Sequence, residues 1–99
     1  MLNITARHEN DTLIMSLEGQ LDTNTARELD AALKENLDGV KNLTLDFEKL
    51  NYTSSAGLRV LLATEKRIRN TGRMEIIHVN EIIRDAFDVT GLTDLFNIS

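Results

Sequence analysis

Residues 51–58 have the sequence N-Y-T-S-S-A-G-L, in which a polar segment gives way to apolar residues at helical spacing. Just before them, residues 43–47 (L-T-L-D-F) alternate apolar and polar side chains, the pattern of a half-buried strand. Together they predict a strand, a short loop and a helix, with Ser54 and Ser55 at or beside the helix N-cap. A serine there most commonly caps free backbone N–H groups. The positive end of the helix can also hold a phosphate, which is the alternative role.

The size, charge and composition of the chain exclude several classes of protein. Its 99 residues predict one domain, 1–99, and the net charge of −5 argues against a nucleic-acid binder. There is no cysteine, so a disulfide framework and thiolate metal sites are excluded. The N-terminus lacks the pattern of a signal peptide, and no apolar run approaches the roughly 20 residues that span a bilayer. We therefore expect a cytoplasmic protein without direct membrane insertion.

The first part of the chain predicts a hairpin followed by a helix. Apolar residues alternate in residues 2–6 and again in residues 12–18, and a turn signal at Asn10-Asp11 separates the two runs. A cluster of potential N-caps follows. The pair Thr25 and Glu28 has the spacing of a capping box, but Asp22 or Thr23 could cap instead. Helical spacing then continues to a stop at Asp38-Gly39.

The second part predicts two more helices and another strand. The helix after the serines should run to about Asn70, and residues 73–79 should form a strand covered on both faces. Asn80 could cap a third helix over residues 81–89, and the apolar tail should dock as a strand end or helical turn. The order β-β-α-β-α-β-α predicts an α/β fold: a mixed, mainly parallel sheet with an N-terminal hairpin and helices packed against it.

The apolar faces of these elements predict the core. The residues expected there are Leu13, Met15, Leu29, Leu33, Leu45, Phe47, Leu58, Leu61, Leu62, Ile76 and Phe87. In the third helix, Ile82, Ile83 and Ala86 should also face inward, whereas Ala56 and Val60 fall off the buried stripe of their helix. A partner could use those two side chains, although isolated exposed apolar residues are common.

Nothing in the sequence favours an enzyme. Ser55 lacks the G-x-S-x-G setting of a nucleophile elbow, and only His8 and His78 could serve it as a base. No metal-ligand spacing, Walker loop or G-x-G-x-x-G occurs, so we expect no metal and no cofactor. Asp22 and Asp46 each end a predicted strand, where open α/β sheets place their sites, but capping would explain either one as well.

Three segments resemble the STAS domain of bacterial anti-sigma factor antagonists, and the resemblance spans the whole chain. They are residues 19–26 (G-Q-L-D-T-N-T-A), 45–47 (L-D-F) and 52–61 (Y-T-S-S-A-G-L-R-V-L). The resemblance implies a monomer that binds an anti-sigma factor of the GHKL-type serine kinase class and so frees a sigma factor. The kinase would phosphorylate the antagonist and release it, and a PP2C-type phosphatase would restore it.

The resemblance also implies which residues act. Alignment on Gly57-Leu58 places the phosphoacceptor at Ser55. The family often has aspartate where this chain has Ser54, and Ser or Thr where it has Ala56, so Ser54 is a second candidate acceptor. The implied partner-binding surface consists of Asp22, Thr23, Asn24, Ser54, Ser55, Ala56, Gly57, Arg59 and Val60.

Two other functions are compatible with a STAS domain. The domain could be the accessory subunit of a lipid-type ABC transporter, docking the transport ATPase without any modified serine. It could also be a nucleotide sensor that switches no partner.

Overall fold

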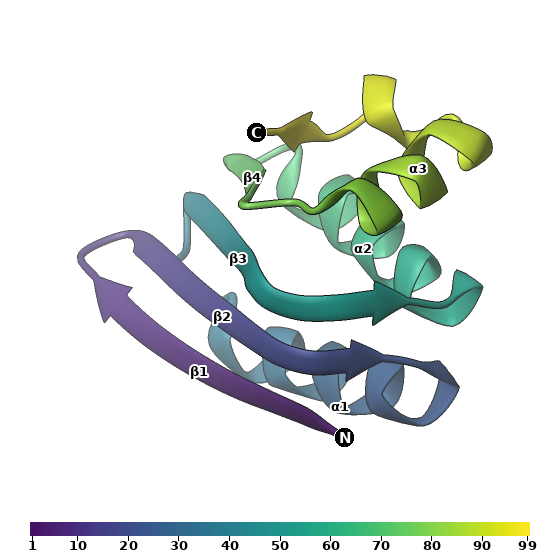
Figure 1. Cartoon of the computed structure of the whole chain (residues 1–99). Helices are drawn as coiled ribbons and strands as arrows, with labels where there is room; N and C mark the ends of the chain where they lie inside the picture. The colour runs from purple at the N-terminus through teal and green to yellow at the C-terminus, as the bar shows by residue number, and fades with distance from the viewer.

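The computed structural model describes residues 1–99 as one five-stranded sheet with helices against it (Figure 1). The elements in chain order are β1 (Leu2–Glu9), β2 (Thr12–Leu21), α1 (Thr23–Asn36), β3 (Asn42–Thr53), α2 (Ser55–Ile68), β4 (Arg73–Ile77), α3 (Glu81–Thr90), the short 3₁₀ helix η1 (Leu92–Asp94) and β5 (Asn97–Ile98). The strands follow the spatial order β1-β2-β3-β4-β5. Only the β1–β2 pair is antiparallel. The predicted mixed, mainly parallel α/β sheet is confirmed.

The β1–β2 hairpin turns at Asn10 and Asp11, where the sequence predicts it. Asn10 has a φ of 57°, a left-handed conformation that asparagine tolerates better than most residues. Glu9 then pairs with Thr12, and the ladder runs to the pair Leu2–Gly19. The hairpin leaves β2 free to pair on its other side with β3.

The sheet is covered on one face only. Helices α1 and α2 both lie behind the strands in Figure 1, and no helix crosses the near face of β1–β3. On the covered face β4 buries Met74 and Ile76, whereas Glu75 and Ile77 on the other face are half-buried. The prediction that this strand is covered on both faces is therefore wrong. Its alternation is regular up to Ile76, and only Ile77 at the strand end obscures it.

The core contains every predicted residue but one. Leu62 is half-buried because it lies on the flank of α2 beside α3 and η1 rather than against the sheet. In α3, Ile83 and Phe87 are fully buried, and Ala86 is half-buried. Ile82 was expected inside but is 66% exposed. Adjacent residues of a helix diverge by about 100°, so Ile82 and Ile83 cannot both face the sheet.

Strand β3 is longer than predicted. Its buried residues are Leu43, Leu45, Phe47, Leu50 and Thr53, so the spacing changes from two residues to three after Phe47. The pairing of β3 with β2 shifts register at two places in this stretch, as β-bulges do. The polar segment predicted as a loop before the serines is therefore strand as far as Thr53, and Ser54 follows it directly.

The helix ends explain where the remaining elements start and stop. Of the candidate caps of α1, the structure selects Asp22. Asn80 caps α3 as expected and also donates through Nδ2 to the Leu50 carbonyl of β3, at 3.0 Å. Gly91 ends that helix with a left-handed φ of 75°. The tail then forms both a helical turn and a strand end. None of the helices has the length and apolar character of a membrane-spanning segment.

Leu61 gives a direct test of the phase of α2, because its side chain is completely buried. We expect Leu61→Ala to lower the free energy of unfolding by about 2–5 kcal/mol, the range for truncating a buried leucine. Urea denaturation would measure it. Ile82→Ala, at an exposed helical position, is the matched control and should cost less than about 0.5 kcal/mol. An equally small loss at Leu61 would contradict the packing of α2 described above.

Candidate functional site

The ends of β2 and β3 bring the two polar motifs together. Leu21 pairs with Thr53 as the last pair of the parallel ladder, and the N–H of Ser54 donates to the Leu21 carbonyl at 2.8 Å. Each strand leads at once into a helix, so α1 and α2 begin side by side at the same edge of the sheet (Figure 1). Asp22 and Ser54 are the caps of these two helices. The expected proximity of Asp22 to the serines is therefore present.

The two adjacent serines have different environments. Ser54 is the N-cap of α2: its backbone is extended and its Oγ accepts from the N–H of Gly57 at 3.3 Å. Ser55 is the first helical residue, and its side chain is exposed. The hydroxyl of Ser54 is thus occupied by the helix end, whereas that of Ser55 is available to another molecule.

Gly57 holds α2 close to the strands. A Cβ atom at this position would lie 2.5 Å from Thr53 Oγ1 and 2.7 Å from Leu21 Cγ, closer than real Cβ contacts come. Any side chain would push the helix away from the strand ends. Gly57 is itself buried, so it contributes to the site only by allowing the helix to approach the strands closely.

Asp22 has a structural role at the start of α1. Its Oδ1 accepts from the N–H groups of Thr25 and Asn24 at 2.9 and 3.0 Å, and the Thr25 hydroxyl accepts from the Asp22 N–H at 2.7 Å. This reciprocal capping box satisfies free N–H groups of the helix. The pKa of Asp22 is lowered below its ordinary value, chiefly by the hydrogen bond from the Thr25 N–H. Smaller contributions from the Thr25 hydroxyl and the Asn24 N–H act in the same direction, and together these bonds outweigh desolvation, which would raise the pKa.

Two shallow grooves border the exposed side of α2. The first lies between α1 and α2 and is lined by Thr23, Ala26, Arg27, Asp30, Ala56, Arg59 and Val60. The second lies between α2 and the end of α3 and is lined by Ser55, Leu58, Arg59, Leu62, Thr90 and Leu92. Arg59 borders both. Asn24 is exposed beside the α1 cap.

Apart from Thr23, the α1 side of the first groove was not predicted. It adds Ala26, Arg27 and Asp30 to the residues inferred from the sequence. A signal was present, because these positions follow Thr23 at helical intervals and so share one side of α1 with it. The surface that contains the predicted residues is thus contributed by two helices.

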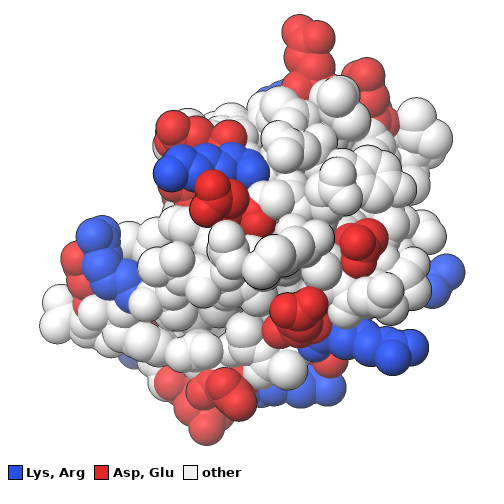
Figure 2. Space-filling model, turned by 60° about the horizontal axis from the view of Figure 1, so that its bottom comes forward, with Lys and Arg blue, Asp and Glu red and all other residues white.

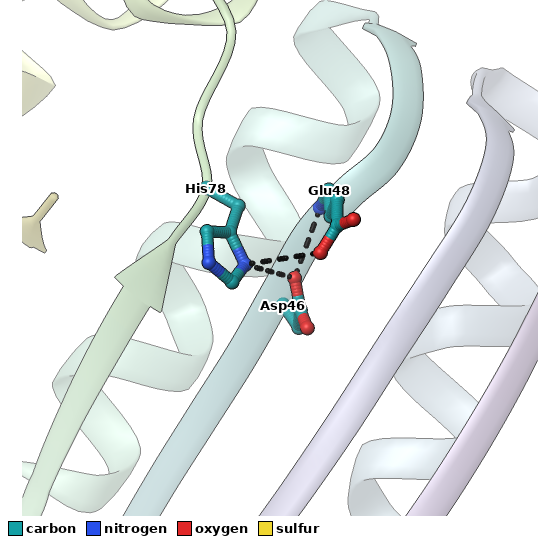
Figure 3. Close-up of side chains that lie close together, drawn as sticks. All are labelled: Asp46, Glu48 and His78. Atoms are coloured by element: carbon teal, nitrogen blue, oxygen red, sulfur yellow. Dashed lines mark hydrogen bonds and ion pairs between the residues drawn. The ribbon is translucent and has the colours of Figure 1, made fainter.

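A separate polar cluster lies on the uncovered face of the sheet, where Asp46 and Glu48 of β3 face His78, just after β4 (Figure 3). His78 Nδ1 lies 2.8 Å from Asp46 Oδ1 and 3.7 Å from Glu48 Oε1. One potential ligand atom from each residue lies within 4.8 Å of the others, so these three side chains could in principle hold a metal ion. The mutual hydrogen bond and ion pairs account for the arrangement without a metal. Sequence spacing could not predict it, because His78 and Asp46 are 32 residues apart.

The cluster shifts the pKa of two of its members. The hydrogen bond with Asp46, aided by the charges of Asp46 and Glu48, raises the pKa of His78 against a smaller effect of desolvation. Partial burial alone would raise the pKa of Asp46. The bonds from His78 and the Glu48 N–H, with the charges of His78 and Lys49, together outweigh burial and lower it.

Charge on the surface is mixed. On the face drawn in Figure 2, Lys and Arg side chains alternate with Asp and Glu, and a broad uncharged area lies between them. That face has no continuous basic patch, the usual footprint of nucleic-acid binding.

Comparison with known proteins identifies the family. A family model described as STAS domain matches residues 3–99. The chain belongs to the STAS-domain family. It is 33% identical over 89 residues to BtrV of Bordetella bronchiseptica, named as an anti-sigma factor antagonist, covering 88% of this STAS chain and 77% of BtrV.

Solved structures share the fold of this STAS domain. An anti-sigma factor antagonist from Mycobacterium paratuberculosis superposes with a TM-score of 0.88 at 23% identity, covering 99% of this chain and 85% of that one. SpoIIAA, a cell-fate determinant of Bacillus solved in its phosphorylated form, gives a TM-score of 0.77 at 19% identity, covering 98% and 91%. The family inferred from the sequence motifs is thus confirmed.

The His78–Asp46 pair predicts a pH-dependent contribution to stability. Because folding raises the pKa of His78, this contribution is fully present below the ordinary histidine value near 6.5 and is lost as the pH rises through the raised value. Because folding lowers the pKa of Asp46, its contribution is present above the ordinary value near 3.8 and is lost as the pH falls through the lowered value. His78→Gln should therefore destabilise the domain most between pH 3.8 and 6.5.

Urea unfolding of both proteins across this pH range would measure the effect. Repeating the comparison in an Asp46→Asn background is the control, because the charge that Asp46 contributes to the ion pair is then already removed. A deficit of the same size at every pH, or one unaffected by Asp46→Asn, would contradict the assignment.

Proposed function

We propose that this STAS domain is an anti-sigma factor antagonist that binds an anti-sigma factor of the GHKL-type serine kinase class and thereby releases a sigma factor. The observation that carries the proposal is the juxtaposition of Asp22 with Ser54-Ser55, fastened by the 2.8 Å bond from Ser54 to Leu21, in a chain with antagonist relatives. The domain acts by binding, and the chemistry belongs to the partner. It works as a monomer in the cytoplasm.

Ser55 is the phosphoacceptor in this proposal. Two observations support it over Ser54: its hydroxyl is exposed, and it is not used as the helix cap. A phosphate there adds about −1.5 to −2 of charge at pH 7, which the positive end of α2 tolerates. The fold therefore stays intact and the added charge acts on the interface. SpoIIAA, which shares the fold, has been solved in both phosphorylated and unphosphorylated forms.

The interface itself is the exposed part of the two helix starts. Thr23 of α1 lines one side of the first groove, and the other side is lined by Ala56, Arg59 and Val60 of α2. Asn24 is exposed next to Thr23 in α1. Ser55 lines the second groove, which shares Arg59 with the first. A phosphate on Ser55 makes binding at this surface require desolvation of a near-dianion, which is strongly unfavourable. A PP2C-type phosphatase would reverse the modification and restore binding.

The relatives favour this function over the transporter alternative. BtrV and the M. paratuberculosis protein are both named as anti-sigma factor antagonists. A transporter subunit would need no modifiable serine, whereas this chain presents a free hydroxyl at the helix start.

Phosphorylation of Ser55 can be tested with paired variants. We expect mass spectrometry, after incubation with the anti-sigma kinase of the same genome and ATP, to show one phosphate on the wild type and on Ser54→Ala, and none on Ser55→Ala. Unmodified Ser55→Ala should keep partner affinity and lose less than about 0.5 kcal/mol of stability, because Ser55 is exposed.

The controls distinguish a loss of folding from the loss of the phosphate acceptor. Ser54→Ala removes a cap and should cost about 0.5–2 kcal/mol, so circular dichroism must first show that this variant is folded. Phosphate on Ser55→Ala but not on Ser54→Ala would move the acceptor to Ser54. If neither serine is modified and the protein instead co-purifies with a transport ATPase, the transporter function replaces the proposal.

The role of the Asp22 carboxylate needs a variant that spares the cap. Asp22→Ala removes the carboxylate and the capping box together, so it should cost about 0.5–2 kcal/mol of stability as well as any binding. Asn caps about as well as Asp, so Asp22→Asn removes only the charge. Because the Asp22 carboxylate belongs to the proposed interface, we expect isothermal titration calorimetry to show weaker binding of the kinase for both variants. Weakening by Asp22→Ala alone would assign Asp22 a purely structural role.

A further inference from the structure

Arg59 is placed to respond to the state of Ser55. The two residues are four positions apart on α2, which puts them on neighbouring turns of one side of the helix. Both line the groove between α2 and the end of α3. Arg59 is exposed, and none of the ion pairs of the chain includes it. Its guanidinium is therefore available for an anion placed at Ser55.

We propose that phosphorylated Ser55 binds the guanidinium of Arg59, and that this internal ion pair withdraws Arg59 from the groove between α1 and α2. The inference rests on the proposed function, because it presumes that Ser55 is modified. Phosphorylation then changes the partner-binding surface in two ways: it adds negative charge at Ser55 and removes a positive charge one turn away.

The chemistry of the two groups favours the pair. A phosphoserine offers three strong acceptor oxygens, and the planar guanidinium presents paired N–H donors that match a phosphate. Cβ atoms four residues apart on a helix are about 5–6 Å apart, within reach of a side chain as long as arginine. The anion also lies N-terminal to the cation, the better orientation for such a pair.

The neighbouring charged groups leave the Arg59 guanidinium without an ion-pair partner in the unmodified chain. Across the first groove, Arg27 repels it and Asp30 is the only carboxylate of the lining. Asp30 is already paired with Lys34 at 3.0 Å. In the second groove the remaining polar side chain, Thr90, donates its hydroxyl to the Ala86 carbonyl at 2.7 Å. Within the unmodified chain Arg59 forms no ion pair, and the lining of the second groove holds no carboxylate that would compete with a phosphate on Ser55.

The test installs phosphoserine at position 55 by genetic-code expansion, so that no kinase is needed. A ³¹P NMR titration then gives the second pKa of the phosphate in the otherwise wild-type chain, in Arg59→Gln and in Arg59→Lys. Arg67→Gln is the matched control: it removes the same charge from an exposed position of α2 that lies about 18 Å along the helix axis from Ser55. Screening at 0.1 M salt, with a Debye length of about 10 Å, makes its effect small.

We expect Arg59→Gln to raise the phosphate pKa by about 0.3–0.7 pH unit, as for an exposed ion pair, and Arg67→Gln to leave it unchanged. Arg59→Lys should restore part of the shift, because the charge remains but the paired donors are lost. Equal pKa values in the wild type and Arg59→Gln would overturn the inference. So would an equal rise for Arg67→Gln, which would indicate only a general field.

A second measurement links the pair to binding. For the unmodified protein, Arg59→Gln should weaken binding of the anti-sigma kinase, because it removes the cation that phosphorylation would otherwise withdraw. Unchanged affinity would show that Arg59 takes no part in the interface. A failed kinase assay at Ser55 would instead refute the proposed function while leaving the phosphate titration valid, so the two failures can be told apart.

Discussion

The candidate site depends on one backbone hydrogen bond, from the Ser54 N–H to the Leu21 carbonyl at 2.8 Å. It completes Leu21–Thr53, the last pair of the parallel β2–β3 ladder, and so fixes where both following helices begin. Each helix then starts on a side-chain cap, Asp22 for α1 and Ser54 for α2. The close approach permitted by Gly57 keeps α2 against the same strand ends. A surface made from two distant segments is thus held by rigid elements, as precise recognition requires.

The two faces of the sheet have different roles. The covered face carries the single apolar core between the strands and the helices α1 and α2. The uncovered face is polar and is tied across β3 and β4 by the Asp46–His78 pair. The exposed serine lies on neither face but at the edge where the parallel strands end, the usual location of sites in open α/β sheets. Chemistry at Ser55 can therefore change the surface without disturbing the core.

Most of the fold could be predicted from the sequence, because alternation and cap residues are local signals. The turn at Asn10 and the α3 cap Asn80 were both found that way. The end of β3 was not, because its bulges break the alternation that identifies a strand. The division of roles between Ser54 and Ser55 was also beyond the sequence, since both fit a helix start and only the actual end of β3 decides which one caps. The His78–Asp46 pair required the tertiary fold to bring β3 and β4 together.

The bulges of β3 also limit which changes of chain length the domain can accept. The bulges set which residues after Phe47 point inward, so inserting or deleting one residue between Phe47 and Thr53 would change which of the following side chains face the core. Leu50 or Thr53 would then leave the core, and the first residue of α2 would be displaced relative to α1. Surface loops usually accommodate such length changes at little cost. In this segment the number of residues is therefore as much a part of the specification as their identity.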